Sequence, residues 1–223
     1  THSILAYAGG NTTNNNLAEG MMGLHSPAPA DASKFAARTS HLLEIYPKEF
    51  SYAQMNLLDS HDMPRFLSLV REDVRRLKLA YLFLMTYPGA PTIYYGDEIG
   101  LTGGRDPLNR ASFPWDKSKW NQDLLDFVRE LIMIRHSMPV LRTGSYEPIF
   151  TQGSVLGYLR RDSEDTVLVV TNADEKTQMV TIDLNGAIPE QTELQDQIGK
   201  GKYTVENNSV SLTIPALSGV ILA

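Results

Sequence analysis

Hydrophobic and polar positions along the first part of the chain follow patterns that predict helices alternating with short buried strands. Capping residues or apolar spacings of three and four indicate helices over residues 35–46, 72–86 and 121–137. Two short apolar runs between them, residues 52–58 and 90–96, are typical of strands. This order predicts parallel β/α units joined by right-handed crossovers. Two strands cannot close a barrel, so we expect further strands from outside this sequence.

The pattern changes after residue 142, where short β-rich runs replace the helical spacings. Turn signals such as Asp162-Ser163 and Asn185-Gly186 separate these runs. Short strands punctuated in this way predict an antiparallel β-sandwich. We therefore expect two domains, residues 1–142 with an α/β fold and residues 143–223 with an all-β fold. The β-rich runs cover residues 154–161, 166–172, 178–184, 210–214 and 218–223.

Charge is distributed unevenly along the chain. The net charge of −6 arises from 26 acidic and 20 basic side chains. Residues 1–142 are balanced, with 15 of each sign, whereas residues 143–223 carry 11 acidic and 5 basic side chains. This step fits a domain boundary near residue 142, although a solvated acidic face would give the same count. Because no basic cluster is present, a nucleic-acid partner is not expected.

The amino-acid composition limits the expected cellular compartment and the kinds of site in the chain. The chain has no cysteine, which excludes disulfides and thiolate metal sites. Its longest apolar run, residues 79–85, is too short to cross a bilayer, so no membrane partner is expected. No secretory leader is visible at the start of the sequence. Together these features favour a cytoplasmic protein.

The segment at residues 56–67, NLLDSHDMPRFL, carries the first candidate chemistry. In parallel α/β proteins the reactive groups lie at the carboxyl ends of strands, and His61 and Asp62 follow such a strand directly. The pair offers two directed polar groups that could bind sugar hydroxyls, ligate a metal or take part in acid–base chemistry. An isolated His-Asp pair is more often a capped turn with a structural histidine.

Two segments rich in Gly, Asn and Pro predict loops, at residues 9–33 and 97–120. The second follows the strand predicted at residues 90–96 and contains Asp106 and Arg110. A loop of this length at a strand end is commonly functional. The four-residue spacing of Asp106 and Arg110 also fits an ordinary solvated ion pair, which contributes little to stability.

With both segments considered together, the chain resembles the α-amylase family of glycoside hydrolases. NLLDSHDMPRFL is similar to the seventh-strand region of that family, and GAPTIYYGDEIGLTGGRDPLNRASFPWD, residues 89–116, is similar to its eighth strand and the following loop. The resemblance is closest to the cyclomaltodextrinase, neopullulanase and maltogenic amylase branch. It implies the last β/α units of a (β/α)8 TIM barrel, followed by a C-terminal antiparallel β-sandwich.

The resemblance also implies roles for individual residues. Asp62 corresponds to the third catalytic carboxylate, which hydrogen-bonds the sugar in subsite −1, and His61 binds the same sugar. Asp106 and Arg110 match positions that hold the neighbouring sugar in subsite −2. No metal site and no cofactor are expected within this chain. Among the other side chains of these segments, we expect structural roles for Asp59 and Arg65. Trp115 and Trp120 could stack on a sugar, but packing of the loop is the favoured role.

The nucleophilic Asp and the acid Glu of the family lie after its fourth and fifth strands, and neither has a counterpart here. The resemblance therefore implies a retaining glycoside hydrolase whose N-terminal portion, as a separate or cleaved chain, supplies both groups. The expected substrates are α-glucans with α-1,4 bonds: cyclodextrins, pullulan or maltooligosaccharides. A plain α-amylase or an oligo-1,6-glucosidase is an alternative within the family. The alternative outside catalysis is a carbohydrate-binding or structural fragment.

Overall fold

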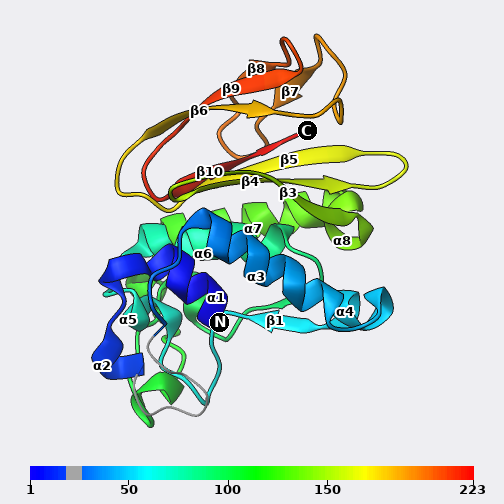
Figure 1. The fold of residues 1–223 in the computed structure, drawn as a ribbon. Helices are drawn as coiled ribbons and strands as arrows, with labels where there is room; N and C mark the ends of the chain where they lie inside the picture. The colour runs from blue at the N-terminus through cyan, green and yellow to red at the C-terminus, as the bar shows by residue number, and fades with distance from the viewer. Residues whose placement is uncertain (19–26) are drawn as a thin grey trace.

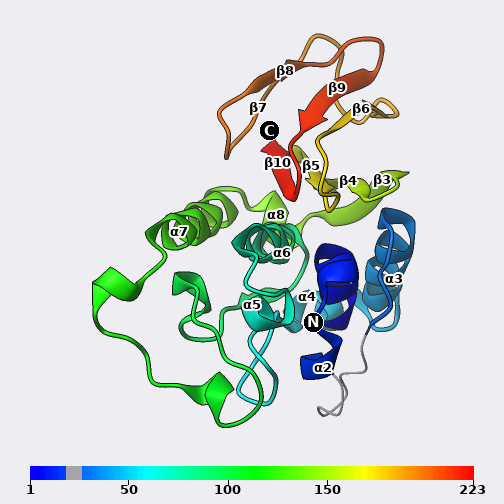
Figure 2. The same cartoon turned by 90° about the vertical axis from the view of Figure 1, so that its left-hand side faces the viewer.

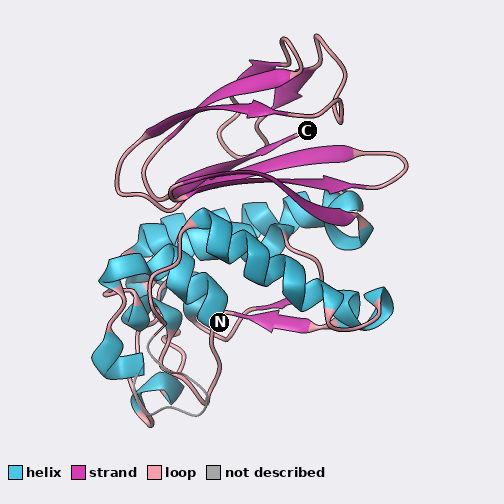
Figure 3. Cartoon of the chain, in the orientation of Figure 1, coloured by secondary structure: helices cyan, strands magenta, loops and turns pink. Residues whose placement is uncertain are grey.

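A layer of helices separates two kinds of β-sheet in the computed structural model, which describes residues 1–18 and 27–223 (Figure 1). On one side of the helices lie the parallel strands β1 (Met55–Leu57) and β2 (Ala90–Thr92). On the other side lie the antiparallel strands that follow residue 144 (Figure 3). The structure thus confirms an α/β part followed by an antiparallel all-β part.

The helices all belong to the first part of the chain. Three are long enough to form the helical layer: α3 (Ala32–Glu44), α6 (Val74–Thr86) and α7 (Gln122–Ser137). Each begins at a side-chain cap, because Asp31, Asp73 and Asn121 accept a hydrogen bond from a backbone N–H in the first turn. The shorter helices are α1 (His2–Ile4), a π-helix (Leu5–Gly9), α2 (Asn15–Ala18), α4 (Lys48–Ala53), α5 (Phe66–Leu69) and α8 (Val140–Thr143).

The strand predicted at residues 52–58 is wrong in its first part. Helix α4 extends through Ala53, and β1 begins only at Met55. Ser51 stabilises this helix because its hydroxyl donates to the carbonyl oxygens of Leu43 and Tyr46. The second strand is also shorter than predicted, since β2 ends at Thr92. The parallel pairing is therefore restricted to residues 55–57 and 90–92.

The loop predicted at residues 9–33 contains helical turns that its composition did not indicate. A 3₁₀ turn covers Gly10–Thr12 and α2 covers Asn15–Ala18, while α3 begins at Ala32. The part of this prediction at residues 19–26 lies outside the described residues. The loop after β2 matches its prediction better, because the described chain from Asp97 to Trp120 contains only short 3₁₀ turns.

The C-terminal strands form one larger and two smaller antiparallel sheets. The larger sheet has the order β10-β5-β4-β3, and the smaller ones pair β6 with β9 and β7 with β8. Three of these strands, β3, β7 and β8, were not predicted from the hydrophobic pattern. The bounds are β3 (Ser145–Gln152), β4 (Val155–Arg161), β5 (Thr166–Asn172), β6 (Gln178–Asp183), β7 (Glu193–Gln195), β8 (Lys202–Thr204), β9 (Ser209–Ile214) and β10 (Ser218–Leu222).

The larger sheet is covered on both faces (Figure 2). Helices pack on one face, where Leu156, Tyr158 and Val169 join the core of the first part of the chain. The smaller sheets pack on the other face, where Val155 and Leu168 belong to a second core. Burial on both faces explains why β4 and β5 are nearly continuous apolar runs. Among the described residues, no helix has the length and hydropathy needed to cross a membrane.

Candidate active site

The site lies where β1 and β2 end. These strands are parallel and in register, with Met55 beside Ala90 and Leu57 beside Thr92, so their carboxyl ends meet at one edge. Asn56 of β1 helps to hold the two strands together, because its side-chain amide donates to the carbonyl oxygen of Pro88, just before β2, at 2.8 Å. The loop after β1 carries His61 and Asp62, and the loop after β2 carries Asp106 and Arg110. The two loops therefore project from the same edge.

The structure brings all four predicted site residues together. The Nε2 atom of His61 lies 3.3 Å from Oδ1 of Asp62, and Nη2 of Arg110 lies 3.7 Å from the same oxygen. On its other side, Nε of Arg110 lies 3.2 Å from Oδ1 of Asp106. These side chains are between 47 % and 64 % exposed, which leaves them accessible to a ligand.

The turn that presents Asp62 is held by its own residues and by the opposite loop. Within the turn, the N–H of Asp62 donates to the hydroxyl of Ser60 at 3.2 Å. From the opposite loop, Nε of Arg110 donates to the carbonyl oxygen of His61 at 3.0 Å, and the amide of Asn109 donates to the same oxygen at 2.8 Å. Asn109 is fully buried and was not singled out in the sequence. Its partners are distant in sequence, so no local pattern could have identified it.

Arg65 and Asp59 have structural positions, as expected. The buried carboxylate of Asp59 accepts a hydrogen bond from the N–H of Phe66, which closes the segment that follows β1. The buried guanidinium of Arg65 donates to Oδ1 of Asp97 at 2.7 Å and to the carbonyl oxygen of Tyr95 at 2.8 Å. It also lies over the ring of Tyr94, 4.5 Å from the centroid. Arg65 thus ties the loop after β1 to the loop after β2.

Burial raises the pKa of Asp97 well above its usual value, and the neighbouring carboxylate of Asp59 raises it further. Burial also raises the pKa of Asp59, although its hydrogen bond with Asp97 opposes this effect. Two carboxyls and one guanidinium share this buried space, so a single proton on Asp97 leaves the cluster neutral. The buried cluster of Asp59, Arg65 and Asp97 thus connects the two loops that carry the site and adds no net charge there.

The two tryptophans of the second loop differ from each other. Trp120 packs in the loop as expected, since its indole N–H donates to the carbonyl oxygen of Pro114 at 2.6 Å and its ring contacts Phe113. Trp115 contacts Phe113 of the same loop edge-on but is 82 % exposed, so it packs less than Trp120. An exposed tryptophan in this loop is not part of the chain's core.

No group of three His, Cys, Asp or Glu side chains in the described ranges is arranged to hold a metal ion. The side chains gathered at this edge are two carboxylates, an imidazole and a guanidinium. Such a set can hydrogen-bond several hydroxyl groups at once and can stabilise positive charge that develops beside Asp62. It lacks a second carboxylate placed across a bond from Asp62, since Arg110 stands between Asp62 and Asp106.

Comparison with known proteins identifies two family matches that together span most of the chain. Residues 25–144 match the family described as alpha amylase, catalytic domain. Residues 144–222 match the family described as alpha-amylase C-terminal domain. His61, Asp62, Asp106 and Arg110 all lie within the first match.

Curated relatives of this chain are much longer than it is. A cyclomaltodextrinase of Geobacillus thermopakistaniensis is 35% identical over 211 residues, which are 93% of this chain and 35% of that protein. A cyclomaltodextrinase of a Bacillus species is 44% identical over 66% of this chain and 26% of its own length. An amylopullulanase of Thermoanaerobacter thermohydrosulfuricus is 34% identical over 87% of this chain and 15% of its own length. The chain spans about a third or less of these relatives.

Solved structures give the same result for the fold. A protein of Thermus thermophilus, Ttha1563, superimposes with a TM-score of 0.92 at 33% identity, over 99% of this chain and 46% of that one. The native debranching enzyme of Nostoc punctiforme superimposes with a TM-score of 0.88 at 33% identity, over 100% of this chain and 46% of that one. Both the helical part and the β-sandwich are therefore similar to those proteins in arrangement as well as in sequence.

Proposed function

Because this chain belongs to the α-amylase family, we propose that it is the C-terminal part of a retaining glycoside hydrolase that cleaves α-1,4-glucosidic bonds. The substrates we propose are cyclodextrins, pullulan and maltooligosaccharides. The names of the relatives support this class, since they include cyclomaltodextrinase, amylopullulanase and neopullulanase. The single observation that carries the proposal is the convergence of His61, Asp62, Asp106 and Arg110 at one strand edge.

Asp62 acts in this proposal on the sugar whose bond is broken. Its carboxylate accepts hydrogen bonds from sugar hydroxyls and stabilises the oxocarbenium-like transition state through its negative charge. His61, 3.3 Å away, donates to the same sugar. Arg110 and Asp106 hold the next sugar, and their ion pair fixes the direction of both side chains. An exposed ion pair of this kind adds little to folding, which supports a ligand-binding purpose.

The nucleophile and the acid come from an N-terminal portion of the enzyme, as a separate or a cleaved chain. A retaining mechanism needs two carboxyl groups on either side of the scissile bond, about 5–5.5 Å apart. Among the described residues, Asp106 is the other site carboxylate, and Arg110 separates it from Asp62. The great length of the relatives supports the existence of such a portion.

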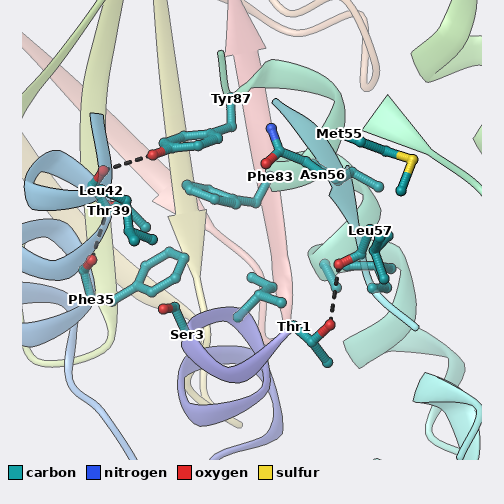
Figure 4. A pocket seen from close by; sticks show the side chains of 14 residues that line it. Thr1, Ser3, Phe35, Thr39, Leu42, Met55, Asn56, Leu57, Phe83 and Tyr87 are labelled. Atoms are coloured by element: carbon teal, nitrogen blue, oxygen red, sulfur yellow. Dashed lines mark hydrogen bonds between the residues drawn. The ribbon is translucent and has the colours of Figure 1, made fainter. Parts of the chain in front are cut away.

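An open apolar pocket beside β1 supports the same conclusion (Figure 4). The pocket lies between β1, α3 and α6, and Phe35, Leu57 and Phe83 line it. Within the described ranges β1 pairs only with β2, and Met55 is 65 % exposed. Strands of a parallel barrel are covered on both faces and paired on both edges. We propose that a strand of the N-terminal portion pairs with β1 and fills this pocket.

The direct test replaces Asp62 by Asn in the assembled enzyme. We expect kcat on a cyclodextrin to fall by about 1000-fold, because the shape is kept and only the charge is lost. The matched control is Asp126→Asn on α7, since Asp126 is also exposed and paired with an arginine, Arg129. The control should keep wild-type kcat, and native mass spectrometry should confirm assembly of both variants.

Near-normal turnover by Asp62→Asn would overturn the role proposed for this carboxylate. A wild-type enzyme that binds maltotriose in calorimetry but never hydrolyses it would favour the non-catalytic carbohydrate-binding fragment instead. Retention has its own readout, which is the anomeric form of the first product by NMR. An α product supports a retaining mechanism and a β product contradicts it.

A further inference from the structure

We propose that Asn109 is a positioning residue that sets the place of Asp62 through the carbonyl groups of its two neighbours, His61 and Met63. The inference rests on the catalytic role proposed for Asp62. It concerns a side chain that touches no substrate and belongs to the opposite loop. One buried amide thus connects the loop after β2 to the turn that carries the carboxylate.

The contacts of Asn109 are specific to the two neighbours of Asp62. Its Nδ2 donates to the carbonyl oxygen of His61 at 2.8 Å and to that of Met63 at 3.0 Å. The two bonds of this amide lie one on each side of residue 62. The side chain of Asn109 is fully buried, which limits the access of water to the donor of these bonds. The backbone of Asp62 is held at both ends by one rigid group.

Only a side chain that donates twice can make this connection. Both partners are carbonyl oxygens, which accept and never donate. An aspartate at position 109 has the same shape, but it would set a carboxylate against two carbonyl oxygens. The bonds would be lost, and negative charge would be added near Asp62 and Asp106. Position 109 therefore requires a hydrogen-bond donor, whereas a residue that only filled the space would not.

Asn109 can position Asp62 because it is itself held firmly. It lies in the 3₁₀ turn Leu108–Arg110, which packs directly on Gly103. A Cβ atom at Gly103 would lie 2.4 Å from the carbonyl oxygen of Leu108 and 2.9 Å from Cα of Asn109, so only glycine permits this approach. Gly103 is anchored in turn, since its carbonyl oxygen accepts from the N–H of Arg65 and its N–H donates to the hydroxyl of Ser68.

Other tethers of the turn are local or exposed. Within the turn itself, the N–H of Asp62 donates to the hydroxyl of Ser60 and the N–H of Met63 donates to the carbonyl oxygen of Ser60. Arg110 donates to the carbonyl oxygen of His61, but its side chain is half exposed and also pairs with Asp106. A bound sugar that hydrogen-bonds to Arg110 would compete with its bond to the carbonyl oxygen of His61. The bonds of Asn109 are independent of the ligand. Asn109 is therefore the buried side-chain contact that ties the turn of Asp62 to the opposite loop before the substrate arrives.

The test replaces Asn109 by Asp in the assembled enzyme and follows kcat and KM separately. We expect kcat on a cyclodextrin to fall by about 100-fold, because a misplacement of roughly 1 Å has that effect on reacting groups. We expect KM to change by less than about threefold, since the groups that bind the sugars are kept. A loss of packing alone would lower the unfolding midpoint without this separation of kcat from KM.

The matched control is Asn172→Asp in the β-sandwich. Asn172 is also fully buried, and its Nδ2 donates to the carbonyl oxygens of Lys176, Ile214 and Pro215. Both variants should lower the unfolding midpoint, but Asn172→Asp should keep wild-type kcat. If Asn109→Asp does not fold, Asn109→Ser replaces it, because serine retains one donor. Wild-type kcat in a folded Asn109 variant, a rise in KM alone, or failure of both Asn109 variants to fold would overturn the inference.

A second readout separates this inference from the proposed function. Hydrogen exchange of peptides covering residues 59–66, measured without substrate, should accelerate in Asn109→Asp and stay unchanged in Asn172→Asp. Unchanged exchange in Asn109→Asp would overturn the positioning role and leave the glycosidase proposal intact. A wild-type enzyme without turnover would overturn the glycosidase proposal, while faster exchange in the variant would still support the tether on the turn.

Discussion

Arg65 is a charged side chain that the fold removes from water at the base of the site. It shares a buried space with Asp59 and Asp97, and its guanidinium contacts Tyr94 and Tyr95. An unpaired buried charge is costly, so the balance between one guanidinium and two carboxyls decides the protonation of the cluster. Because the pKa of Asp97 is raised, the folded protein keeps a proton that the unfolded chain releases.

Asp97→Asn tests this protonation through the pH dependence of stability. The folded wild type binds the extra proton, so its free energy of unfolding should decrease as the pH rises above about 4. Asparagine has no such proton, and its amide imitates the protonated carboxyl. The stability of Asp97→Asn relative to wild type should therefore increase with pH in urea unfolding curves measured between about pH 4 and about pH 8. A difference that is constant over this range would contradict the assignment.

Arg65→Met tests the ion pair itself. The substitution keeps the apolar stem but leaves the Asp59 and Asp97 carboxyls without their cation. We expect a loss of about 3 kcal/mol in the free energy of unfolding, which is typical of a broken buried pair. Arg129→Met on α7 removes an exposed arginine from its pair with Asp126 and should cost less than about 0.5 kcal/mol. Equal effects of the two substitutions would mean that Arg65 is not a buried anchor.

At the residue scale, the sequence was most informative where a motif is continuous. His61 and Asp62 are adjacent, and Asp106 and Arg110 are four apart, so a resemblance could place them in one site. Asn109 was missed because its hydrogen-bond partners are 48 and 46 residues away, and an asparagine in a turn has no distinguishing pattern. A tertiary contact of this kind becomes visible only in the fold.

At the scale of elements, Arg160 of β4 joins the helical layer to the larger sheet. Its guanidinium is buried and donates to the carbonyl oxygens of Thr86, Leu141 and Gly144, at the ends of α6 and α8. Carbonyl groups at helix C-termini lack partners within the helix, and a cation there is favourable. Arg160 replaces the missing partners of two helices at once, so it fixes both against β4.

Arg160→Leu should therefore lower the free energy of unfolding by about 3 kcal/mol, because several buried carbonyl oxygens lose their donor. The neighbouring Arg161→Leu is the matched control, since Arg161 is exposed and forms an exposed ion pair with Glu147 at 3.3 Å. It should change stability by less than about 0.5 kcal/mol. Chemical unfolding of both variants decides the matter, and similar midpoints would contradict the proposed role of Arg160.

The elements predicted best were those with local signals at both ends. Helix α7 starts at the cap Asn121 and ends at Ser137, which matches the helix predicted over residues 121–137. Strand β1 was predicted too long because an apolar run does not distinguish a strand from a short preceding helix. Strand β3 was missed because its residues have no apolar alternation and are only half-buried for most of their length.

At the scale of the whole molecule, the helical part and the larger sheet share one core. Aromatic rings from both parts form a continuous cluster, with Phe83 of α6 in contact with Tyr146 of β3 and Tyr158 of β4. The hydroxyls of Tyr158 and Thr86 share a hydrogen bond at 2.6 Å across the boundary. A core that spans both parts predicts a single cooperative unfolding transition.

Tyr158→Phe tests this cooperation. Removing one hydroxyl should lower the free energy of unfolding by about 1 kcal/mol, since Thr86 keeps its bond to the carbonyl oxygen of Leu82. Both tryptophans, Trp115 and Trp120, precede the sandwich, so their fluorescence reports on the helical part. Far-UV circular dichroism includes the β-strands. The two signals should shift together, and separate midpoints would contradict a shared core.

The proposed division of the active site between this chain and an N-terminal portion is tested most directly by reconstitution. The measurement is the release of reducing sugar from a cyclodextrin by this 24.8 kDa chain, by the N-terminal portion and by the two together. Turnover should require both, because Asp62 and the two missing carboxyl groups act on the same bond. Turnover by either part alone, or none from a complex that native mass spectrometry confirms, would contradict the proposal.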